Sequence, residues 1–128
     1  MRVFKNRRVD RFARKSGISD RDLCEAVDRA NRSLIDANLG GGVIKQRIAR
    51  AGQGKSGGFP TVILFTTQQR AIFVIGFAKN DRQNITDEEL RLTREAARFF
   101  LELSGSAMEA IVATGEITEV KCHEKTLS

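Results

Sequence analysis

The sequence contains no tryptophan and no tyrosine, and only one histidine, one proline and two cysteines. The absence of Trp and Tyr disfavours base stacking on aromatic side chains as the main means of binding a ligand. Cys24 and Cys122 are far apart and form no CxxC pair. We therefore expect free thiols rather than a metal site or a disulfide. No spacing typical of metal-ligand sets occurs, so the sequence predicts no metal and no other cofactor.

Long hydrophobic runs are also missing. No apolar segment approaches the roughly 20 residues that a membrane-spanning helix needs, and the N-terminal stretch lacks the apolar core of a signal peptide. We therefore expect no membrane partner and a cytoplasmic location. The length of 128 residues predicts a single domain over residues 1–128, with a mobile tail at residues 121–128.

Positive charge is concentrated in the first half of the chain. Residues 1–60 hold 14 Lys and Arg against 6 Asp and Glu, whereas residues 61–128 hold 8 against 10. A net charge of +6 distributed in this way is typical of a protein with a polyanionic partner. A solvated basic surface without a specific partner is the simpler alternative.

Hydrophobic periodicity predicts an α+β fold. An N-terminal helical hairpin packs on a small antiparallel sheet, which consists of a three-strand meander and a short N-terminal strand, and further helices follow. The expected helices span residues 7–15, 20–37, 87–103 and 106–114, and the expected strands span residues 2–5, 43–49, 61–65, 71–77 and 117–121.

The meander at residues 43–77 is the part of the chain where we expect chemistry. Its first strand alternates apolar residues with Lys45 and Arg47, which gives one apolar and one cationic face. Its first and third strands run in the same direction, so their ends lie at the same end of the sheet. We therefore predict that cations from remote segments meet there. The catalytic candidates are Lys45, Arg47, Lys79 and Arg82, and the substrate-binding candidates are Arg50, Lys55 and Asp81.

Two of these candidates have simpler interpretations. The segment GQGKSGG around Lys55 lacks the first glycine and the following helix of a nucleotide-binding phosphate loop. It is then either a loop that lets Lys55 reach a phosphate or only a long hairpin connection. Asp81 could act as a general base or a metal ligand, but such a residue is more often a turn former or an ion-pair partner of Arg82.

Three segments resemble the RelE/ParE superfamily of toxins from bacterial type II toxin–antitoxin systems, in particular a RelE/HigB-like branch. They are FARKSGISDRDLCEA, GGGVIKQRIARAGQGKSGG and FVIGFAKNDRQNI, and the resemblance covers residues 2–120. It implies a small basic toxin that is silenced by a cognate antitoxin. It also implies an mRNA endonuclease that works on the ribosome without a metal, through attack of the ribose 2′-hydroxyl on the adjacent phosphate. Lys45 and Arg47 match the basic pair of the family's strand, and Lys79 and Arg82 match its basic loop.

The chain departs from the family pattern at two points. An aromatic residue followed by Arg is usual at the start of the second strand, where this chain has Phe59-Pro60, and the C-terminal Tyr of some relatives is absent. The alternatives are therefore a ParE-like toxin that inhibits DNA gyrase without cutting RNA, and an inactive module that binds an antitoxin or nucleic acid.

Overall fold

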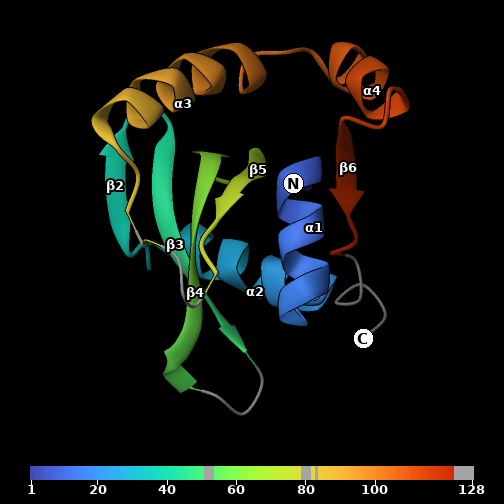
Figure 1. The fold of residues 1–128 in the computed structure, drawn as a ribbon. Helices are drawn as coiled ribbons and strands as arrows, with labels where there is room; N and C mark the ends of the chain where they lie inside the picture. Colours follow the sequence, from blue (N-terminus) through green and yellow to red (C-terminus); the bar gives the residue numbers. More distant parts are fainter. Residues whose placement is uncertain (51–53, 79–81, 83, 123–128) are drawn as a thin grey trace.

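The structure, a computed structural model, describes residues 1–50, 54–78, 82 and 84–122, and of residues 50 and 54–57 it describes only the backbone. Within these residues four helices and six strands form an α+β fold (Figure 1), which confirms the predicted fold class. The helices are α1 (Arg7–Ser16), α2 (Asp20–Asn31), α3 (Asp87–Phe100) and α4 (Gly105–Ala113). The strands are β1 (Arg2–Asn6), β2 (Ala37–Gly40), β3 (Val43–Arg50), β4 (Gly54–Thr66), β5 (Arg70–Gly76) and β6 (Ile117–Val120).

All six strands belong to one sheet with the order β2-β3-β4-β5-β1-β6. Neighbouring strands are antiparallel except β1 and β5, which pair in parallel. The sheet is larger than the sequence predicts, because β2 adds an unexpected strand at one edge. Strand β6, at the other edge, corresponds to the expected strand at residues 117–121. Strands β3 and β5 both pair with β4 and run in the same direction.

Helices cover both faces of this sheet. One hydrophobic cluster joins the sheet to α1 and α2 through residues such as Val9, Leu23 and Phe73. A second cluster joins the opposite face to α3 and α4 through residues such as Ala97 and Met108. In Figure 1, α3 runs across the strands towards α4, which lies beside β6. No helix in the described part of the chain is long and apolar enough to cross a membrane.

The second helix is shorter than predicted. It ends at Asn31 instead of residue 37, and Ser33 then adopts a φ of 67°, in the left-handed region that an α-helix excludes. Residues 37–40 form β2, whose sequence ANLG contains no β-branched residue and therefore gives no strand signal. Pairing with β3 makes it a strand.

Strand β4 is longer than predicted and contains Pro60 in its interior. We expected a strand that begins at residue 61, but β4 begins at Gly54. Pro60 lies opposite Arg47 on β3, and its carbonyl accepts a hydrogen bond from the Phe77 N–H on the other side at 3.1 Å. The position of the missing N–H of Pro60 therefore faces the end of β5, where β4–β5 pairing ends. The absent N–H costs no hydrogen bond between β3 and β4.

The expectation of free thiols is wrong. Cys24 on α2 and Cys122 after β6 form a disulfide, with their Cα atoms 5.6 Å apart. The two residues are separated by 98 positions in the sequence. Only the packing of α2 beside the C-terminal edge of the sheet brings them together, and no local pattern signals this.

Candidate functional site

Strand β3 presents Lys45 and Arg47 on the sheet face that α3 covers in part. The intervening side chains point to the opposite face and are buried on the side of α1 and α2: Ile44, Gln46 and Ile48. Val43 precedes the two cations on their own face and is buried in the cluster beneath α3 and α4. The period of two thus places both cations on one side of the strand, just beyond its apolar part.

Lys45 and Arg82 meet at Asn84, although they come from different segments. The Lys45 Nζ donates to Asn84 Oδ1 at 2.6 Å. One guanidinium nitrogen of Arg82 donates to the backbone carbonyl of Asn84 at 2.7 Å. Arg82 and Asn84 therefore lie beside β3, and two cations that are 37 positions apart in the chain share one neighbour.

Arg47 lies on the same face as Arg82. Arg47 is opposite Pro60, and Phe77 is hydrogen bonded to Pro60 on the next strand. The Phe77 ring belongs to the cluster on the α3 side, and the Arg82 guanidinium carbon lies 5.7 Å from its centroid, a cation–π distance. We call Lys45, Arg47 and Arg82 the cationic face.

Close packing fixes the Arg47 side chain. Its guanidinium donates to the Gly58 carbonyl at 3.1 Å. A Cβ atom at Gly58 would lie 2.7 Å from the Arg47 Cγ, so the side chain needs a glycine at that position. The Arg47 guanidinium has no carboxylate partner among the residues that the structure describes.

The backbone of β3 is held in place from α2 and from the residues before β2. The Arg47 N–H donates to Asp36 Oδ2 at 2.7 Å, and the Arg29 guanidinium donates to the Arg47 carbonyl. The fully buried Gln46 amide donates to the Ala26 and Leu34 carbonyls, both at 3.1 Å. The cations are thus mounted on a rigid strand, as a site that must position a substrate requires.

The Glu89 carboxylate contacts the cationic face through Arg82. Arg82 donates to both of its oxygens, at 2.8 and 2.6 Å, and the Thr86 N–H donates to it at 2.9 Å. These hydrogen bonds, those from Arg82 first, lower the pKa of Glu89 from about 4.5 to about 2. Glu89 is therefore an anion at neutral pH, which fixes Arg82 and makes Glu89 a poor proton acceptor.

The Glu89–Arg82 pair predicts a pH-dependent stability. The folded-state pKa lies below the unfolded value, so the pair stabilises the fold above about pH 5 and less as pH falls towards about 2. We expect Glu89→Gln to lower the free energy of unfolding at pH 7 and to lower it less at pH 3, because the wild-type carboxylate is then partly protonated in the unfolded chain. Denaturant unfolding of both proteins at pH 7, 5 and 3 measures this difference, and a difference that is constant over the series would contradict it.

Four of the predicted site residues have no described side chain. Lys79 and Asp81 lie outside the described residues, and for Arg50 and Lys55 only the backbone is described. The sequence analysis missed Asn84, which contacts both Lys45 and Arg82, and Glu89, which pairs with Arg82. Glu89 has a local signal, because it is the third residue of a Thr86 capping box, but nothing in the sequence links it to Arg82.

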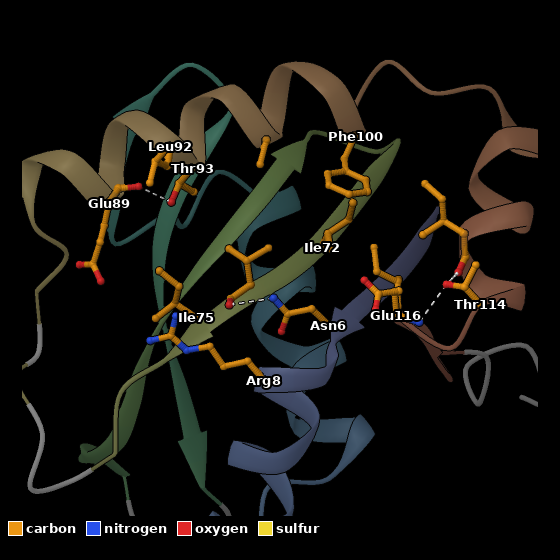
Figure 2. Close-up of a pocket in the computed structure, with 14 residues that line it drawn as sticks. Asn6, Arg8, Ile72, Ile75, Glu89, Leu92, Thr93, Phe100, Thr114 and Glu116 are labelled. Carbon is orange, nitrogen blue, oxygen red and sulfur yellow. Dashed lines mark hydrogen bonds between the residues drawn. The ribbon is translucent and has the colours of Figure 1, made fainter.

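A cavity of about 600 Å³ adjoins the cationic face (Figure 2). It lies between β5, α3 and α4, and Glu89 belongs both to its lining and to the Arg82 ion pair. Most of its wall is aliphatic or aromatic, including Ile75, Leu92 and Phe100. Among the described side chains there is no cluster of His, Cys, Asp and Glu that could hold a metal ion.

The fold and this surface define a small basic α+β protein with cations gathered on one sheet face. The chain matches the family model described as RelE toxin of the RelE/RelB toxin–antitoxin system over residues 1–120. The protein therefore belongs to the RelE toxin family, and membership implies a cognate antitoxin as its partner. A comparison with curated proteins gave no match.

Proposed function

We propose that this toxin is an mRNA endonuclease that acts on the ribosome in the cytoplasm, in a RelE/HigB-like manner. The observation that carries the proposal is the meeting of Lys45 and Arg82 at Asn84, with Arg47 on the same face. A cluster of fixed cations on a rigid strand can hold an RNA backbone and stabilise additional negative charge on one of its phosphates.

In this mechanism the 2′-oxygen of a ribose attacks the adjacent phosphorus, and the bond to the 5′-oxygen of the next nucleotide breaks. The 2′-hydroxyl loses its proton to a base, and the leaving 5′-oxygen takes up a proton. The products are a 2′,3′-cyclic phosphate and a 5′-hydroxyl. We assign the scissile phosphate to Lys45, Arg47, Lys79 and Arg82, and binding of the flanking strand to Arg50, Lys55 and Asp81.

Pro60 replaces a residue that could contribute to phosphate binding in this activity. It occupies the position between Arg47 and Phe77 on the cationic face, where the family pattern has an arginine. A proline cannot contact phosphate through a side-chain donor or through an N–H. Charge stabilisation therefore depends on the cations from β3 and from the loop after β5.

The proposed activity is tested by induced expression of the toxin followed by mapping of RNA 5′ ends. We expect new ends inside translated codons, with 5′-hydroxyl and 2′,3′-cyclic phosphate termini, and no such ends in RNA that is not translated. Co-expression of the cognate antitoxin should abolish them. Intact mRNA together with induction of the DNA-damage response would overturn the proposal and indicate a ParE-like action on gyrase.

A further inference from the structure

We propose that Arg8, near the start of α1, binds a backbone phosphate of the mRNA strand whose scissile phosphate lies on the cationic face. Arg8 would thereby position the strand across the sheet. The inference rests on the proposed function and adds to it a second binding position, on a helix that carries none of the residues assigned above.

Asn6 fixes the start of α1 against the sheet. Strand β1 ends at Asn6, whereas its neighbour β5 continues to Gly76. The Asn6 side chain donates to the Val74 carbonyl at 3.0 Å and accepts a hydrogen bond from the Val9 N–H at 2.9 Å. The first turn of α1 thus lies where β1 would otherwise continue, beside the last residues of β5.

From this turn Arg8 reaches the sheet face that carries Lys45. Arg8 and Ile75 line the same cavity, and Figure 2 shows the Arg8 guanidinium beside Ile75, on the side where Glu89 lies. Ile75 pairs with Val62, which pairs with Lys45. Lys45, Val62 and Ile75 thus form one row across three strands, with Lys45 at one end and Arg8 beside the other. Two strand spacings amount to roughly 10 Å, so one extended nucleic-acid strand can contact both cations.

The structure gives Arg8 no other role. It is exposed and has no hydrogen bond or ion pair with any residue that the structure describes. Other arginines of the chain serve the fold: Arg70 donates to the Phe100 carbonyl at 2.7 Å, and Arg94 donates to the Leu39 carbonyl. An uncommitted guanidinium at the edge of a cationic surface is well suited to bind a phosphate through two parallel hydrogen bonds.

The surroundings of Arg8 offer charge but little means to recognise a base. The Thr93 hydroxyl in the cavity donates to the Glu89 carbonyl, and the Thr114 hydroxyl donates to the Ile111 carbonyl. The Asn6 amide is bonded to Val74. Because these groups are already paired within the protein, we expect the contribution of Arg8 to be the same for every codon.

The test uses single-turnover cleavage by the purified protein on ribosomes programmed with a short mRNA. We expect Arg8→Ala to raise the half-saturating protein concentration about tenfold while the saturating rate stays within about twofold, because a phosphate contact away from the cut contributes binding only. Arg8→Lys should recover part of this loss. Arg21→Ala removes an equally exposed cation from α2, on the other side of the sheet, and should change neither value.

Neutral methylphosphonate linkages in the mRNA identify the contacted phosphate. One such linkage close to the cut should weaken mRNA binding by the wild-type protein. The same linkage should not weaken mRNA binding by Arg8→Ala any further. Arg8→Ala could instead lose affinity while every linkage reduces mRNA binding equally in the variant and in the wild type. In that case the phosphate belongs to ribosomal RNA and the inference is wrong. If Arg8→Ala matches the wild type while changes at Lys45 and Arg47 abolish cleavage, the inference fails and the proposed function stands. Absence of cleavage by the wild type would instead refute the proposed function.

Discussion

Replacement of both Lys45 and Arg47 by methionine should abolish cleavage of mRNA on the ribosome. Methionine removes the charge at both positions and keeps an apolar stem, which at Arg47 packs beside Gly58. One preorganised donor to a developing negative charge is worth roughly 10²–10³ in rate, so loss of two cations should cost about 10³-fold or more. Single-turnover cleavage on programmed ribosomes measures the effect.

Arg21→Met is the matched control for this variant, since it removes one exposed cation from α2. The control should cleave at the wild-type rate. Thermal melts of all three proteins should agree within a few degrees, because Lys45 and Arg47 are only partly buried and methionine keeps an apolar stem at each position. A double variant that is folded and cleaves within about threefold of the wild type would remove both residues from the mechanism.

The largest expected loss of stability follows from Gln46→Leu. The Gln46 side chain is fully buried, accepts the Asp36 N–H at 2.9 Å and donates to the Ala26 and Leu34 carbonyls. Leucine fills the space but leaves these backbone groups without a partner. A buried polar group that loses its hydrogen bond costs about 1–3 kcal/mol, so we expect the free energy of unfolding to fall by roughly 2–4 kcal/mol.

Denaturant unfolding measures this loss, with Gln69→Leu as the control. Gln69 is exposed in the turn between β4 and β5, and the same substitution there should stay within about 0.5 kcal/mol of the wild type. Because Gln46 separates Lys45 from Arg47, the Gln46 variant should also cleave mRNA more slowly. Equal stability of the Gln46 variant and the wild type would show that the Gln46 hydrogen bonds do not anchor β3.

Local signals in the sequence were sufficient for the helix boundaries that depend on capping. Ser19 and Thr86 each form a capping box at the start of a helix, and Gly17 ends α1 in the left-handed conformation. Each of these features depends on residues at most four positions apart. The alternation that places Lys45 and Arg47 on one side of β3 is equally local.

Features that depend on tertiary packing were not predictable. Strand β2 exists because β3 lies beside it, and the Cys24–Cys122 disulfide joins segments at opposite ends of the chain. The contacts of Asn84 with Lys45 and of Glu89 with Arg82 join residues from separate elements of the fold. Arg8 has no signal at all, since its position depends on where β1 stops beside β5.

The central claim is that cations from β3 and from the loop after β5 bind the backbone of one RNA strand on a single face of the sheet. The most direct test is an experimental structure of the protein on a ribosome whose mRNA carries a 2′-deoxy nucleotide at the cut site, which blocks the reaction. We expect a phosphate of that strand at hydrogen-bond distance, roughly 2.7–3.2 Å, from Lys45 Nζ and from the guanidinium of Arg47 or Arg82. An mRNA strand that lies over α1 and α2, or that stays clear of these three side chains, would contradict the claim.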